Sequence, residues 1–170
     1  MTRLLAWLFR ILFRLKIDYR ERLVFDGPTI IMPNHVSFLD AVLLYLMLPS
    51  SVWFVVNTEI AARPLVALAL RFCRHVKIDN RNPYSLRTVI NVVRDGNPVV
   101  LFPEGRISNT GGLMKMYTGA ALVAWKTSAK VYPIILRGPE YSVFSRIKDK
   151  VIPRWLPQIR IFIGEPSVLV

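Results

Sequence analysis

The segment TIIMPNHVSFLD, residues 29–40, joins an apolar run to the start of a helical one through a short polar stretch. Residues 29–32 are typical of a buried strand, and residues 37–48 predict the helix that follows it. Strands that alternate with helices are the building pattern of layered α/β domains. In such domains polar residues at the carboxyl end of a strand are where binding and chemistry gather. The segment therefore predicts an α/β fold with a site close to His35.

The same alternation continues along the chain. Further strands are expected at residues 23–25, 52–56, 76–78, 99–102, 131–136 and 159–163, and further helices at 64–73, 82–95 and 119–127. At 170 residues the chain supports one sizeable core. We therefore expect residues 18–170 to form one domain, a layered, mixed and largely parallel sheet flanked by helices.

The first 17 residues predict an amphipathic helix. Arg3, Arg10 and Arg14 fall on one side of it. The other side is apolar and consists of Leu4, Leu5, Trp7, Leu8, Ile11, Leu12 and Leu15. Such a helix lies in the plane of an anionic bilayer surface, and we favour this interpretation over a helix packed on the domain. A cleaved secretory signal is disfavoured, because arginines interrupt the apolar region.

The composition agrees with a membrane-surface protein. The net charge of +12 fits an anionic membrane, nucleic acid or an acidic protein as partner. The apolar first helix argues against nucleic acid as the main partner. No apolar run approaches the roughly 18 residues that predict a bilayer span. Cys73, the single cysteine, is interpreted as a core residue in a reduced, cytosol-facing protein.

His35 and Asp40 supply a base and an acid that can orient it. If the helix begins near Ser37, His35 precedes it and the Asp40 carboxylate can turn back to the imidazole, which leaves the other ring nitrogen free to accept a proton. Such a pair could activate a substrate hydroxyl for attack on an acyl thioester, with no acyl-enzyme intermediate. The alternative is structural, because residues 37–40 have the spacing of a capping box and His35 would then be a turn residue.

A second motif, FPEGR at residues 102–106, sets Glu104, Gly105 and Arg106 at the end of a buried strand. A guanidinium matches phosphate oxygens, and exposed amides beside a glycine can hold an anion. An exposed turn with a solvated Glu–Arg pair is the alternative. Arg81, in the segment IDNR at residues 78–81, follows another short strand and could reach the same rim.

Four blocks in this order resemble the glycerolipid acyltransferases of the 1-acylglycerol-3-phosphate acyltransferase type: NHVSFLD at 34–40, IDNR at 78–81, FPEG at 102–105 and VYPI at 131–134. The resemblance covers residues 25–140. It implies that His35 is the general base and Asp40 its partner, with no metal and no cofactor. It also implies a set of substrate-binding residues, namely Asn34, Ser37, Arg81, Glu104, Gly105 and Arg106.

The stretch FPEGRISNTGGLMK, residues 102–115, is similar to the acyltransferase part of bifunctional 2-acylglycerophosphoethanolamine acyltransferases and acyl-carrier-protein synthetases. This implies lysophosphatidylethanolamine as acceptor, acyl carrier protein or acyl-coenzyme A as donor, and a synthetase domain as partner if the chain is an excised domain rather than a stand-alone relative. The common family block is FPEGTRS, whereas Arg106 here follows Gly105 directly.

We therefore expect a lysophospholipid acyltransferase, peripheral on the cytoplasmic face of the inner membrane and bound to its anionic surface. A 1-acylglycerol-3-phosphate acyltransferase is the alternative acceptor specificity. Two further functions compete with it. One is a phospholipid hydrolase with water at the same His–Asp pair, and the other is a basic membrane or nucleic-acid adaptor without chemistry.

Overall fold

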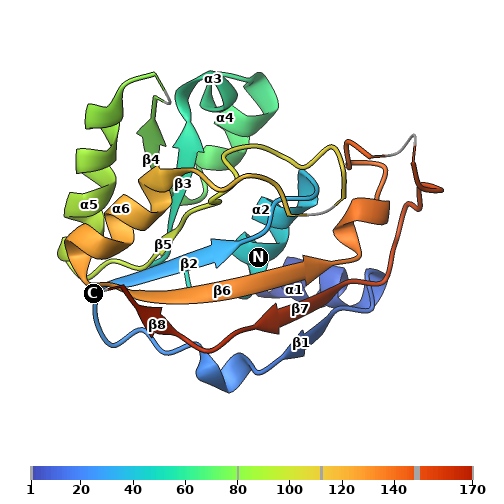
Figure 1. Ribbon diagram of the computed structural model, residues 1–170. Coiled ribbons are helices and arrows are strands. Elements are labelled where there is room, and N and C mark those ends of the chain that lie inside the picture. The colour runs from blue at the N-terminus through green and yellow to red at the C-terminus, as the bar shows by residue number, and fades with distance from the viewer. Residues whose placement is uncertain (1, 80, 112, 148–149, 170) are drawn as a thin grey trace.

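A mixed, largely parallel sheet organises the computed structural model, which describes residues 2–79, 81–111, 113–147 and 150–169 (Figure 1). Within these residues the sheet has eight strands in the order β1-β7-β6-β2-β5-β3-β4, with β8 also beside β6. Strands β6, β2, β5, β3 and β4 are parallel, whereas β7 and β8 are antiparallel to β6. The bounds are β1 Lys16–Asp18, β2 Thr29–Pro33, β3 Trp53–Asn57, β4 Arg74–Ile78, β5 Val99–Val100, β6 Lys130–Arg137, β7 Arg160–Ile163 and β8 Ser167–Val168.

Helices cover both faces of this sheet. They are α1 Thr2–Leu12, α2 Leu39–Met47, α3 Thr58–Ala61, α4 Pro64–Leu70, α5 Leu86–Arg94 and α6 Thr118–Thr127. Successive strand residues point to opposite faces, so Ile31 packs with Leu43 and Leu44 of α2, whereas Ile30 packs with α5 and α6. The result is a three-layer arrangement with α1 and α2 on one face and α5 and α6 on the other.

The predicted fold class is confirmed, and most predicted elements lie within a few residues of the observed ones. The strand predicted at residues 23–25 is wrong. The hydroxyl of Tyr132 accepts from the N–H of Val24 and donates to its carbonyl oxygen, at 3.3 and 3.0 Å. These backbone groups are thus satisfied by one side chain, and no neighbouring strand is needed.

The first helix is shorter than predicted. It ends at Leu12, Arg14 adopts a left-handed φ of 43°, and residues 16–18 then pair with β7 as a strand. Phe9 and Phe13 pack α1 against the sheet. Its predicted apolar side is nevertheless exposed at Leu4, Leu5, Trp7, Leu8, Ile11 and Leu12, while the side chain of Arg3 lies outside the described part of the structure.

Among the described residues, none of the helices has the combined length and apolarity that a bilayer crossing requires. The short helix α3 and the strand β8 were not predicted from the sequence. Helix α3 begins where the side chain of Asn57 accepts from the N–H groups of Glu59 and Ile60. This is ordinary N-terminal capping.

Gly138, at the end of β6, offers a test of the backbone geometry. It has a φ of 106°, and a Cβ there would collide with the carbonyl oxygen of Gln158, whereas Gly96 has a φ of 79° with open space around its Cβ position. Gly96→Ala should lower the free energy of unfolding by about 1–2 kcal/mol through backbone strain alone. Gly138→Ala should lower it by clearly more, because the chain at Gln158 must also move. Urea denaturation of both variants would measure this, and equal losses would contradict the described close approach.

Candidate active site

The two motifs singled out from the sequence lie side by side at the carboxyl edge of the sheet. His35 follows β2 and Glu104 follows β5, and these strands are parallel neighbours with Ile30 opposite Val99. Because parallel strands present their carboxyl ends at one edge, the two loops meet there. The topology thus brings together residues that are far apart along the chain.

Asp40 turns back to His35 from the first turn of α2. The distance from His35 Nδ1 to Asp40 Oδ2 is 2.9 Å, and the Asp40 side chain is completely buried. The same oxygen also accepts the backbone N–H groups of Val36 and Ser37, at 2.6 and 2.8 Å. The catalytic and the capping interpretations of Asp40 therefore describe one arrangement, in which a single carboxylate oxygen holds both the turn and the imidazole.

Burial and hydrogen bonding act in opposite directions on the Asp40 carboxyl group. Burial raises the pKa of the Asp40 carboxyl group, and the hydrogen bond from His35 opposes this shift. Burial also raises the pKa of Glu140, and the negative charge of Asp40 adds to this effect. The hydrogen bonds from His35 and from the backbone of Val36 and Ser37 thus favour the ionised form of Asp40 against its burial.

The imidazole is held in one orientation. Its ring stacks on Phe102 with centroids 4.1 Å apart and an interplanar angle of 26°. When Nδ1 donates to Asp40, Nε2 carries the free lone pair, and it makes no hydrogen bond to any residue that the structure describes. The pair can therefore act as a general base at Nε2.

Glu104 is buried next to this pair and is not exposed to solvent. Its side chain is fully buried, and its carboxylate oxygens accept the N–H groups of His35 and Met114, at 2.9 and 3.1 Å. The N–H of Ser108 donates to the carbonyl oxygen of His35 at 2.7 Å. The backbone of His35 is thus fixed on both sides, and this geometry gives Glu104 a positioning role. Its predicted contact with substrate stays a prediction.

Gly105 and Arg106, the last two residues of the FPEGR motif, are exposed. Gly105 has a φ of 62°, and a Cβ there would lie 3.1 Å from the ring of Tyr117. Arg106 is exposed and makes no ion pair within the described residues. Its predicted contact with an acceptor phosphate stays a prediction.

The remaining predicted site residues make structural contacts. The amide group of Asn34 pairs with the backbone of Leu136 on β6, at 3.1 and 2.7 Å. Ser37 is buried against Ser142, with 2.9 Å between the hydroxyl oxygens. Arg81 lies in the loop after β4, where it forms an exposed ion pair of 3.1 Å with Glu59. A role of these three in substrate binding stays a prediction.

A cavity of about 810 Å³ adjoins the site on the α5 and α6 side of the sheet. Its lining is mainly apolar, and includes Leu86, Leu101, Phe102, Tyr117, Leu122 and Trp125. Phe102 both lines this cavity and stacks on His35. An apolar chain in the cavity would therefore end close to the base. Among the described residues, no three His, Cys, Asp or Glu side chains gather as metal ligands do.

Sequence reasoning missed several contributors to this site. Ser145 is buried, and its hydroxyl donates to the carbonyl oxygen of Val36 at 3.1 Å. Together with Ser142 and Glu140 it belongs to the segment after β6, which carries no periodic pattern and so gave no signal. The stacking of Phe102 on His35 was missed for another reason. Its position in the sequence predicts the end of a buried strand.

Comparison with known proteins decides the family. A family model described as Acyltransferase matches residues 14–137. The chain belongs to this acyltransferase family. The match contains the His35–Asp40 pair, the loop of Glu104 and the strands that position both.

Individual relatives agree with this assignment. The chain is 35% identical over 117 residues to the chloroplastic 1-acyl-sn-glycerol-3-phosphate acyltransferase LPAT1 of Arabidopsis thaliana, covering 66% of this chain and 33% of that protein. It is 29% identical over 147 residues to the lysophospholipid acyltransferase LPCAT4 of Mus musculus, covering 82% of this chain and 26% of that protein. The chain thus spans about a third or less of the length of these relatives.

The fold also has a solved counterpart. The crystal structure of the 1-acyl-sn-glycerophosphate acyltransferase PlsC from Thermotoga maritima superposes with a TM-score of 0.73 at 22% identity, covering 98% of this chain and 68% of that one. This similarity supports the α/β architecture with its mostly parallel sheet.

Two substitutions at Asp40 separate its structural contacts from its charge. Asp40→Ala removes the acceptor of two buried N–H groups and should lower the free energy of unfolding by about 2–5 kcal/mol. Asp40→Asn keeps one oxygen for these donors, and its amide nitrogen takes the position of Oδ1, which has no hydrogen-bond partner in the described residues. This variant should lose less than about 1.5 kcal/mol. Urea denaturation would compare them, and similar losses would show that Oδ2 does not hold the turn.

Proposed function

We propose that this chain transfers a fatty acyl group from an acyl thioester to a free glycerol hydroxyl of a lysophospholipid, with His35 as general base. The observation that carries the proposal is the buried Asp40 carboxylate hydrogen-bonded to Nδ1 of His35 while Nε2 stays free. Membership of the acyltransferase family supports the reaction class.

The chemistry follows from this arrangement. Nε2 takes the proton of the acceptor hydroxyl as its oxygen attacks the thioester carbonyl carbon. The tetrahedral intermediate then collapses, the carbon–sulfur bond breaks, and the departing thiolate takes the proton back from Nε2. The negative charge on Asp40 stabilises the transient imidazolium. The chain gains no covalent intermediate and needs no activated nucleophile of its own.

The cavity beside Phe102 suits the donor. Its apolar lining matches a fatty acyl chain, and Phe102 connects it to the imidazole. Acyl carrier protein and acyl-coenzyme A are both candidate carriers, since each presents an acyl chain as a thioester. The resemblance of residues 102–115 to the bifunctional enzymes favours acyl carrier protein, with a synthetase domain as partner.

Two acceptors are candidates. That same resemblance favours lysophosphatidylethanolamine. The names of the relatives in plants favour 1-acylglycerol 3-phosphate. The two differ in whether the phosphate carries an ethanolamine, so a cation such as Arg106 near the phosphate would favour the doubly charged acid.

We also propose that the chain lies peripherally on an anionic membrane, at the cytoplasmic face of the inner membrane. The exposed apolar side of α1 supports this, because Trp7, Leu8 and Ile11 would leave water on insertion among headgroups. The net charge of +12 adds attraction to anionic lipid.

Replacement of His35 tests the mechanism. His35→Ala should lower the rate of acyl transfer by about 10²–10⁴-fold or more, because the base is lost. Vesicle binding and the free energy of unfolding should stay close to those of the parent chain, since the imidazole side chain is not part of the apolar core. Transfer at the parental rate by this variant would reject the mechanism.

The assay should use both acceptors and both donors, with mass analysis of the products. Acylated lysophospholipid that depends on added acceptor supports the proposal. Free fatty acid as the product, independent of acceptor, would indicate a hydrolase and reject it. Asp40→Asn serves as the matched variant, because it should remain folded and still lose much of the rate.

Trp7 tests the contact of α1 with the membrane. Trp7→Ser should weaken binding to vesicles that contain anionic lipid by about tenfold, because a large apolar side chain no longer enters the interface. Trp155→Ser is the matched control, because this tryptophan is also well exposed but lies in a loop far along the chain from α1. Sedimentation with vesicles measures both, and equal effects of the two substitutions would contradict a specific role of α1.

A further inference from the structure

Besides α1, helix α4 and the turn that follows it also expose large apolar side chains. Leu65, Leu68 and Phe72 are spaced along one side and are 83%, 54% and 65% exposed. Large apolar side chains that gather in this way on a surface mark a contact with a partner or a membrane. The proposed function does not involve these three residues.

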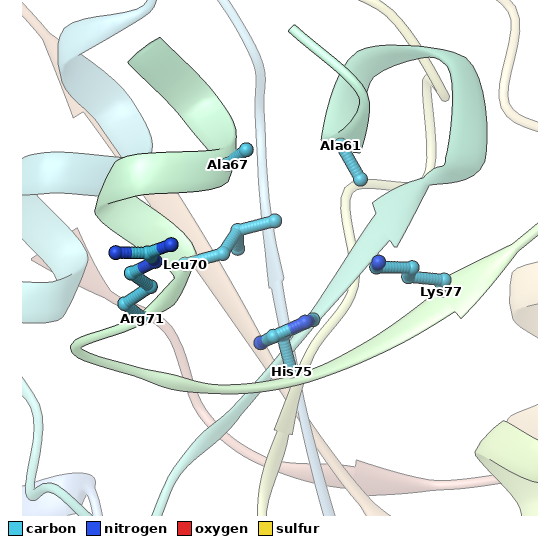
Figure 2. Close-up of a pocket in the computed structure, with 6 residues that line it drawn as sticks. All are labelled: Ala61, Ala67, Leu70, Arg71, His75 and Lys77. Atoms are coloured by element: carbon cyan, nitrogen blue, oxygen red, sulfur yellow. The ribbon is translucent and has the colours of Figure 1, made fainter. Parts of the chain in front are cut away.

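A small cavity of about 160 Å³ lies beneath the same helix (Figure 2). Its walls are Ala61, Ala67 and Leu70, and its other lining residues are the three basic ones, Arg71, His75 and Lys77. None of the six lining residues is acidic. Figure 2 shows His75 and Lys77 rising from β4 toward the space beside α4, with Arg71 at the end of that helix. The cavity is therefore small and basic, and its lining suits a bound anion.

The strand β4 shows why this arrangement is unusual. Val76 packs with α5 and α6 on one face, so His75 and Lys77 on either side of it point to the opposite face, toward α4. The surface of a sheet beneath a helix is ordinarily apolar. Nδ1–H of His75 donates to the carbonyl oxygen of Cys73 at 3.2 Å, which fixes the ring in place. A bound phosphate would offset the repulsion among the neighbouring cations.

Helix α4 lies on the same side of the sheet as α1. The Tyr45 hydroxyl on α2 donates to the carbonyl oxygen of Phe72 at 3.0 Å, which joins α2 to the turn after α4. Helix α2 in turn contacts α1, and it lies between α4 and α1 in Figure 1. Phe38 and Val42, at the start of α2, are exposed as well. Exposed apolar side chains therefore lie on α1, at the start of α2 and on α4, on the same side of the sheet.

We propose that α4 and its basic cavity form a second membrane contact, in which Arg71, His75 and Lys77 bind the phosphate of an anionic phospholipid while Leu65, Leu68 and Phe72 enter the acyl layer. Basic side chains beside an exposed apolar strip are the combination that recognises an anionic lipid surface. The inference rests on the membrane location in the proposed function, and not on the catalytic mechanism.

Vesicle sedimentation of the full chain tests this contact, with phosphatidylcholine vesicles compared to vesicles that contain phosphatidylglycerol. Each cation near an anionic surface contributes about a fivefold increase in affinity. Arg71→Gln/Lys77→Gln should therefore weaken binding to the phosphatidylglycerol vesicles by roughly 25-fold and leave binding to phosphatidylcholine unchanged. The matched control is Arg87→Gln/Arg94→Gln on α5, which packs on the opposite face and should lose less than about twofold.

Two outcomes of this experiment would overturn the proposal. One is parental binding by the Arg71→Gln/Lys77→Gln variant, and the other is an equal loss in the α5 control, which would show that only total charge matters. Inorganic phosphate, added against chloride at the same ionic strength, should not displace the chain. Displacement by it would assign the cavity to free phosphate and reject the lipid.

A second measurement reports the position of α4 without relying on charge. Leu68→Cys in a Cys73→Ser chain, labelled with an environment-sensitive fluorophore, should shift to the blue on phosphatidylglycerol vesicles. Lys126→Cys on α6, labelled in the same background, should not shift. Absence of a shift at position 68 would reject insertion of α4. Both experiments measure binding, so a chain without acyltransferase activity that still passed them would refute only the catalytic proposal.

Discussion

A single carboxylate oxygen, Oδ2 of Asp40, joins the imidazole of His35 to the two N–H groups that begin the turn into α2. This buried acceptor fixes the backbone between β2 and α2 and the tautomer of the base at the same time. Because the carboxylate is removed from water, its interaction with the imidazole is stronger than that of an exposed pair. Local folding and chemistry at this edge of the sheet therefore depend on one atom.

Residues from neighbouring strands and loops hold the segment around Asp40 in place through further hydrogen bonds. The parallel pairing of β2 with β5 delivers Glu104 to the backbone of His35, and the pairing of β2 with β6 delivers the segment that carries Ser142 and Ser145. Glu104 and Ser145 satisfy backbone groups of His35 and Val36, and Ser142 adds a second partner to the hydroxyl of Ser37. Hydrogen bonds thus surround the site, and within the described residues they leave Nε2 of His35 and the buried Oδ1 of Asp40 without a partner.

The layered fold and the His35–Asp40 contact could be predicted because both depend on short-range pattern. Periodic apolar residues indicated the elements, and the need for a turn before α2 brought the two side chains together. The contacts of Glu104 and Asn34 could not be predicted, because each satisfies the backbone of a residue brought close only by the sheet. A polar residue in a motif is readily interpreted as a substrate ligand. When such a residue is buried, its hydrogen bonds are made to the protein itself. The strand prediction for residues 23–25 was wrong for a similar reason, since the hydroxyl of Tyr132 replaced the expected strand partner.

The alternation of Ile30 and Ile31 to opposite faces of β2 has a further consequence. The cavity near Phe102 opens on the side of α5 and α6, while the exposed apolar residues of α1 and α4 belong to the other side. His35 stacks on Phe102, which lines this cavity, while its partner Asp40 belongs to α2 on the other side. In the proposed function, an acyl donor would then reach His35 from the side of α5 and α6 while a lipid acceptor stays on the side of α1 and α4, so that neither would have to pass the other.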